Sequence, residues 1–155
     1  YMSDVGAPRA GSTKAVYVQG GNFTGWGAGV AFNFALDGGA PVAYDVSTAG
    51  GAQFWAKADN PLVVTIALPN VDTDAQGGRC EASGQGDNAC YSHFSKQLSL
   101  TAQWTEHTVR WSELEQPDFG RRVPTFEATQ VYSMNFSIAI DQPFGVWIDD
   151  VALVK

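Results

Sequence analysis

The sequence predicts an all-β protein, a two-sheet antiparallel β-sandwich that forms a single domain over residues 1–155. Apolar residues alternate at a period of two in short runs, Gly, Asn and Pro separate these runs, and no segment keeps a helical apolar period. Hydrophobic residues make up 45% of the chain, which is enough to bury the core of one ordinary domain. Many short strands without a convincing helix favour two packed sheets.

The expected strands are, in chain order, 15–18, 29–36, 52–57, 62–68, 98–100, 107–111, 132–140 and 146–154. In the second of these, Val30, Phe32 and Phe34 share one face. Residues 112–115 are expected to form one helical turn capped by Ser112. The polar stretch 69–96 is longer than a plain connection requires, and loops of this length are often functional.

The charge of the chain excludes two classes of partner. Only 16% of the residues are charged, the net charge is −7, and the basic residues are scattered. Nucleic acids and anionic membranes are bound by clustered Lys and Arg, so neither is expected here. No apolar run approaches the roughly 20 residues that span a bilayer.

The two cysteines, Cys80 and Cys90, lie in a Gly-rich polar segment. Free buried thiols usually lie in apolar strands, so a disulfide between these two is the favoured interpretation. A metal pair is the alternative, but the C-x2-C spacing and further ligands are absent. A disulfide implies an oxidising compartment, so we expect a secreted, extracellular protein.

Several motifs resemble one family. They are Gly-Trp-Gly-Ala-Gly at 25–29, Ala-Gln-Phe-Trp-Ala-Lys-Ala at 52–58, the Trp-x-x-His-x-Val-x-Trp-x-x-Leu pattern at 104–114, and the closing Val-Trp-Ile-Asp-Asp-Val-Ala-Leu at 146–153. Together with the Asp-Thr-Asp, Cys, Cys and His-Phe elements of the long loop, they resemble carbohydrate-binding modules with a galactose-binding-like jelly roll. The resemblance implies a domain attached to a secreted bacterial glycoside hydrolase. His107 departs from the pattern, which has an aromatic residue at that place.

Sugar recognition needs flat aromatic faces and planar polar groups. Trp55 alternates with Phe54, so it is expected on the outer face of its strand, either exposed to a ligand or covered by a loop. Trp26 lies between glycines, where it is either tightly packed or exposed. Trp104 and Trp111 are expected in the core.

The long loop supplies the other candidate sugar contacts, which are Asp72, Asp74, Arg79, Tyr91 and His93. Asp72 and Asp74 are expected to accept hydrogen bonds from hydroxyls, and Arg79 or His93 to donate them. The segment also begins like an EF-hand calcium loop, but Ser83 stands where the bidentate Glu belongs. The alternative is a solvated loop held by its disulfide.

Asp149 and Asp150 are adjacent carboxylates in an apolar last strand. Period two cannot turn Ile148, Val151 and Leu153 all inward unless the strand bulges near the two carboxylates. The resemblance implies a structural calcium here, with Asp4 as a further ligand. A hydrogen-bonded or solvent-facing pair is the alternative.

The function expected is non-catalytic binding of a polysaccharide, a neutral β-glucan or mannan-type plant glycan, by a monomer fused to a catalytic domain. The chain contains no G-x-S-x-G, H-E-x-x-H or P-loop motif, so an enzyme is not expected. Two alternatives stay open. One is an adhesion sandwich that binds protein, and the other is a small lyase or hydrolase in which Tyr91, His93 and Arg79 converge.

Overall fold

The computed structural model describes residues 2–3, 9, 11–83 and 85–155. Its strands are β1 (Met2–Ser3), β2 (Ala15–Gly20), β3 (Ala28–Asn33), β4 (Leu36–Asp37), β5 (Ala40–Pro41), β6 (Gly51–Ala58), β7 (Leu62–Leu68), β8 (Phe94–Leu100), β9 (Thr105–Arg110), β10 (Ser133–Ile138) and β11 (Phe144–Val154). Two short 3-10 helices are η1 (Ala75–Gly77) and η2 (Trp111–Glu113). No helix in the described part of the chain is long and apolar enough to cross a membrane.

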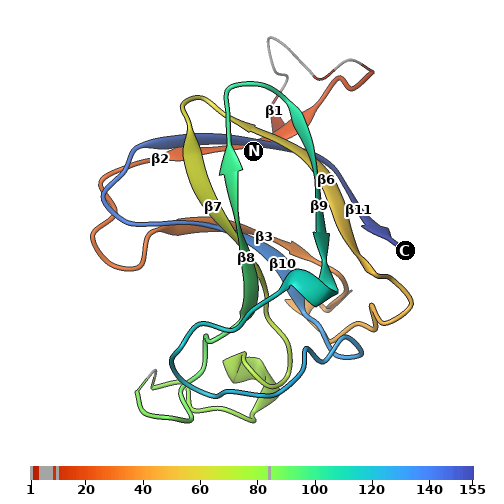
Figure 1. Ribbon diagram of the computed structural model, residues 1–155, viewed down its shortest axis with the longest axis vertical. Helices are drawn as coiled ribbons and strands as arrows, with labels where there is room; N and C mark the ends of the chain where they lie inside the picture. Colours follow the sequence, from red (N-terminus) through yellow and green to blue (C-terminus); the bar gives the residue numbers. More distant parts are fainter. Residues whose placement is uncertain (1, 4–8, 10, 84) are drawn as a thin grey trace.

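The strands form two antiparallel sheets that pack face to face, which confirms the predicted fold class (Figure 1). Sheet A has the strand order β1-β2-β11-β6-β9, and sheet B has the order β3-β10-β7-β8. The strands β4 and β5 form a separate small hairpin.

The alternation of side chains explains how each sheet acquires an inner and an outer face. In β6, Phe54 and Ala56 are buried, whereas Trp55 and Lys57 between them are only half-buried and face outward. The same alternation in β7 buries Val64 and Ile66 and turns Val63 and Thr65 outward.

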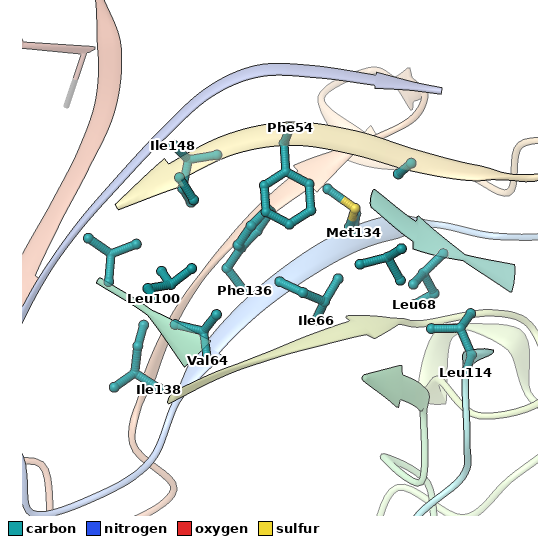
Figure 2. Packing of buried hydrophobic residues seen from close by; sticks show 14 of the residues in the cluster. Phe54, Val64, Ile66, Leu68, Leu100, Leu114, Met134, Phe136, Ile138 and Ile148 are labelled. Atoms are coloured by element: carbon teal, nitrogen blue, oxygen red, sulfur yellow. The ribbon is translucent and has the colours of Figure 1, made fainter. Parts of the chain in front are cut away.

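The core lies between the two sheets (Figure 2). Phe54 of sheet A meets Phe136 of sheet B edge to face, with 4.8 Å between the ring centroids. Burying one such side chain is worth roughly 2–3 kcal/mol. His107 lies at the edge of this core with its ring 5.7 Å from that of Phe54, so it occupies the place of the expected aromatic residue.

The last strand contains the predicted bulge. The pairing of β11 with β6 shifts between Asp149 and Ala152, and Asp150 has a φ of 49°. The bulge returns Val151 to the core, but Leu153 remains 39% exposed.

The long loop 69–93 extends beyond one end of the strands (green in Figure 1) and carries the predicted disulfide, Cys80–Cys90. The connection 114–132 lies against it, because the Arg121 N–H donates to the carbonyl of Ala89 at 2.8 Å. The helical turn predicted at 112–115 is η2, one residue earlier, where Glu113 accepts the N–H of Arg110 at 2.8 Å in place of a cap by Ser112.

Candidate functional site

A groove of about 420 Å³ crosses the outer face of sheet B. Its floor consists of outward-facing residues of three strands, which are Ser137 of β10, Thr65 and Ala67 of β7, and Ser95 and Gln97 of β8. Apart from Gln97 these side chains are small, which leaves the face hollow. We call this the sheet-B groove.

Trp26 stands at one corner of the sheet-B groove. It precedes β3 at the end of the sheet where Ala28 pairs with Ile138, and its side chain is 83% exposed. Gly27 allows the loop to lie against β10, since a Cβ atom there would come within 2.0 Å of the carbonyl oxygen of Ile138. The exposed indole therefore offers an apolar face beside the polar floor.

Tyr91 and His93 occupy the diagonally opposite corner, next to the start of β8. Tyr91 is 50% exposed and directly follows the disulfide-bonded Cys90, and its N–H donates to the carbonyl of Thr73 at 2.8 Å. The His93 ring lies edge-on to that of Tyr91, and its Nδ1 is 2.9 Å from Thr73 Oγ1. Burial lowers the pKa of His93 to about 4, although the charge of Asp74 opposes this, so the ring is neutral at neutral pH.

No Asp, Glu, Lys or Arg of the described chain lines the sheet-B groove. A second depression of about 430 Å³ adjoins it and shares Ser95, Gln97 and Pro117 with it. This second depression is charged, because Lys96 and Glu113 form an ion pair at 2.9 Å on its surface. The surface is therefore uncharged over sheet B and charged in the second depression that adjoins the groove.

The structure does not bring the other loop residues into the groove. Asp72 lies 3.3 Å from Arg79 Nη1 in the loop and 3.5 Å from Arg121 Nη2 in the adjoining connection, so these two cations compensate its carboxylate. Asp74 caps η1 by accepting the N–H of Gln76 at 2.9 Å. Of the five loop candidates, Tyr91 and His93 line the groove.

Trp55 lies on the opposite side of the molecule, on the outer face of sheet A. Its ring is half-buried beneath the guanidinium of Arg9, which is 4.9 Å from the ring centroid. The structure therefore separates Trp55 from Trp26, which the sequence could not do.

The other aromatic residues of this outer face cover one another. In register across the sheet, Trp147 stacks on Tyr17 with 3.8 Å between centroids, and the Lys57 amine lies 5.3 Å from Trp147 and 5.5 Å from Trp104. The prediction that Trp104 is a core residue is therefore wrong, whereas Trp111 does pack against the core. The Trp104 ring lies outside, beside the outward-facing amine of Lys57.

Asp149 and Asp150 were predicted to hold calcium. Arg9 instead lies against both, with its Nε 3.5 Å from Asp149 Oδ2 and its Nη2 in contact with Asp150 Oδ2. Asp149 Oδ2 is buried without a hydrogen bond, so the Arg9 charge is its compensation among the described residues. The third predicted ligand, Asp4, lies outside the described residues, and those described contain no cluster of three or more potential metal ligands. The described side chains by themselves do not form a calcium site, and calcium stays a prediction.

Sequence reasoning missed the groove floor. Four floor residues lie at outward positions of strands whose side chains alternate inward and outward, namely Thr65, Ser95, Gln97 and Ser137. The period-two pattern could therefore have placed them on an outer face. It could not show that their four positions adjoin one another, because that depends on strand order and register.

Comparison with known proteins establishes the fold. Neither a family model nor a curated protein matches the chain. Among solved structures, the family 30 carbohydrate-binding module of a cellulosomal cellulase of Clostridium thermocellum has a TM-score of 0.64 and 15% identity, covering 96% of this chain and 78% of that one. The family 11 module of another cellulosomal cellulase of this organism has a TM-score of 0.58 and 18% identity, covering 93% and 76%.

A further family 11 module from Clostridium thermocellum, solved in complex with a β-1,3-1,4-mixed-linked tetrasaccharide, has a TM-score of 0.57 and 18% identity and covers 93% of this chain and 77% of that one. At this identity the likeness concerns the fold. It agrees with the jelly-roll sandwich that the sequence motifs imply.

Proposed function

We propose that this chain is an extracellular, non-catalytic domain that binds a neutral polysaccharide, a β-glucan or a mannan-type glycan, in the sheet-B groove. The observation that carries the proposal is an uncharged, hydroxyl- and amide-lined groove with an 83% exposed tryptophan at one corner. Stacking on an aromatic face and hydrogen bonds to hydroxyls are the two interactions that a sugar chain offers. Four strands about 4.8 Å apart make the face roughly 14 Å wide, which suits an extended chain of several sugars.

The biological role proposed is to hold an attached secreted enzyme at its substrate, with the domain acting as a monomer. Such tethering raises the local concentration of the enzyme and needs no chemistry in the domain itself. The Cys80–Cys90 disulfide supports an oxidising, extracellular setting. The names of the similar modules, which belong to cellulosomal cellulases, point the same way.

Specific observations weigh against the two alternatives. A lyase would need Arg79 beside Tyr91 and His93, but Arg79 is paired with Asp72 and does not line the groove. A protein-binding sandwich without a sugar site predicts that Trp55 and Trp26 are both buried and that no groove with aromatic and polar groups exists. Trp55 is half-buried, but Trp26 is exposed and borders such a groove.

The test is calorimetric titration with soluble mixed-linkage β-glucan, other β-glucans and mannans. We expect Trp26→Ala to weaken binding by about tenfold or more, because it removes an aromatic contact at the edge of the site. Its unfolding temperature should stay unchanged, since the side chain is exposed.

Trp55→Ala is the matched control on sheet A, and it should leave the affinity unchanged. Loss of binding in Trp55→Ala with full binding in Trp26→Ala would move the site to sheet A. No binding of any of these glycans by the wild-type protein would refute the proposed function.

A further inference from the structure

A chain of three polar residues runs from the interior to the sheet-B groove. Asn70 and Thr73 are fully buried, and His93 lies in front of them and lines the groove. Thr73 holds both aromatic residues of this corner, because its carbonyl accepts the Tyr91 N–H and its Oγ1 contacts His93 Nδ1. Buried polar groups connected in this way have few alternative arrangements of their hydrogens.

The orientation of the Asn70 amide is fixed by its neighbours. The backbone N–H groups of Asp72 and Thr73 both point at Asn70 Oδ1, each at 3.2 Å. Only an oxygen can accept from two N–H groups, so the amide oxygen, and not its nitrogen, faces Thr73.

The orientation of the Asn70 amide also determines where the hydroxyl hydrogen of Thr73 points. Thr73 Oγ1 forms a hydrogen bond with Asn70 Oδ1 at 3.0 Å. Asn70 Oδ1 has no hydrogen to give, so Thr73 must be the donor. Its Oγ1 can therefore only accept from His93 Nδ1, 2.9 Å away, and that nitrogen must carry a hydrogen.

The other ring nitrogen follows from the charge of the ring. Burial in the groove wall keeps His93 neutral at neutral pH, and the titratable groups facing it are Asp74 and Tyr91. A neutral imidazole with hydrogen on Nδ1 has a bare lone pair on Nε2. Among the described residues, the contact with Thr73 is the one hydrogen bond of the ring, so Nε2 is available to a ligand in the groove.

We propose that Asn70 and Thr73 are positioning residues that fix His93 as the Nδ1–H tautomer, so that Nε2 accepts a hydrogen bond from a sugar hydroxyl. This inference rests on the proposed function and reverses the role expected from the sequence, in which His93 donates. It also makes the groove selective. The hydroxyl and amide groups of the groove can each donate or accept a hydrogen bond. His93 Nε2 can only accept, so the ligand must donate a hydrogen there, and an ether oxygen or a carboxylate has none to donate.

The tautomer is tested by long-range ¹⁵N–¹H correlation spectra of the imidazoles in the unliganded protein near pH 7. The chain has two histidines, so a His107→Phe variant assigns the signals of His93. We expect hydrogen on Nδ1. A hydrogen on Nε2 would overturn the inference, whatever the affinity for glycans.

The role in binding is tested by titrating variants with the glycan that the wild-type protein binds. Thr73→Val keeps the shape of the side chain but frees the imidazole to change tautomer, and we expect about five- to tenfold weaker binding. Thr108→Val on the outer face of sheet A is the matched control and should bind normally. Equal affinities for these two variants would overturn the inference.

A second pair of variants tests the acceptor role of His93 even if the Thr73→Val protein fails to fold. His93→Gln retains an acceptor near the position of Nε2 and should keep most of the affinity, whereas His93→Phe should lose as much as Thr73→Val. Equal binding by both would refute the acceptor role. Absence of glycan binding by the wild-type protein would refute the proposed function and this role with it, while an Nε2–H tautomer in a protein that binds would refute the present inference alone.

Discussion

Tryptophan has two different roles in this molecule, and the neighbours of each side chain decide which. Trp26 lies between two glycines in a loop and is 83% exposed. Trp147 has Tyr17 stacked on its ring and the Lys57 amine 5.3 Å from its centroid, while its Nε1–H donates to Asp59 at 2.9 Å. A ring contacted in this way stabilises the sheet, and the exposed ring is the one available for a ligand.

Arg9 is expected to stabilise the protein because it compensates the carboxylate of Asp149. Its side chain is 19% exposed and the side chain of Asp149 is 10% exposed, so Arg9→Ala leaves a largely buried carboxylate without its partner. We expect a loss of about 3 kcal/mol, seen as a fall in Tm of roughly 6–12 °C by calorimetry.

The same scans with EDTA and with added calcium separate Arg9 from a metal ion. If Arg9 compensates the carboxylates, EDTA leaves the Tm of the wild-type protein unchanged. A clear fall of the wild-type Tm in EDTA, restored by calcium, would instead establish the structural calcium that the resemblance implies at Asp149 and Asp150.

At the scale of elements, the loop 69–93 is held in several ways. It contains η1 and the ion pair of Asp72 with Arg79. It is joined to the connection 114–132 beside it by the ion pair of Asp72 with Arg121 and by two hydrogen bonds, from Ser92 Oγ to the carbonyl of Arg121 at 2.6 Å and from Gln116 Nε2 to the carbonyl of Ser92 at 2.7 Å. The corner of the groove that contains Tyr91 is therefore built on an ordered loop.

Removal of the Cys80–Cys90 disulfide should affect both the stability of the protein and its affinity for glycans. Replacing Cys80 and Cys90 together by Ser should lower the free energy of unfolding by about 3 kcal/mol, because the bond closes a short loop in the unfolded chain. Glycan affinity should also fall, since Tyr91 directly follows Cys90. Denaturant titration and calorimetry measure the two effects. Dithiothreitol should reproduce them in the wild-type protein and change nothing in the double variant.

At the scale of the whole molecule, the two sheets differ in their outer faces while sharing one core. Sheet B has small polar residues and a groove, and sheet A has aromatic residues covered by Lys57 and Arg9. Each sheet is also associated with one partly buried histidine, His107 on β9 of sheet A and His93 beside β8 of sheet B.

The two histidines predict how stability depends on pH. Burial lowers both pKa values below 6.5, and that of His93 falls to about 4, so the unfolded chain binds protons more readily. The contribution of the two neutral histidines to the free energy of unfolding is therefore complete above about pH 6.5 and is lost as the pH falls toward 4. The His93 contribution is about 3 kcal/mol. Urea denaturation between pH 7.5 and 4 measures this, and His93→Gln should show a shallower loss. An unchanged pH dependence in that variant would contradict the assignment.

Most of the fold could be predicted from the sequence, because strand patterns are local. The expected strands at 52–57 and 62–68 correspond to β6 and β7 nearly residue for residue, and the bulge at Asp149 followed from a conflict within one strand. Trp104 was placed wrongly because it immediately precedes β9, and alternation along that strand turns it to the face opposite the buried Val109.

The candidate site was predictable only in part. By itself the sequence determined the two-sheet sandwich and the disulfide loop, and it limited the candidate ligand contacts to a few aromatic and polar residues, since these follow from alternation, composition and spacing along the chain. The tertiary structure decided that Trp26, Tyr91 and His93 border one groove, that Trp55 lies on the other sheet, and that Arg9 reaches the two aspartates. The physical reason is that register and sheet packing join residues far apart in the chain, and these contacts decide which ring faces and polar atoms remain uncovered.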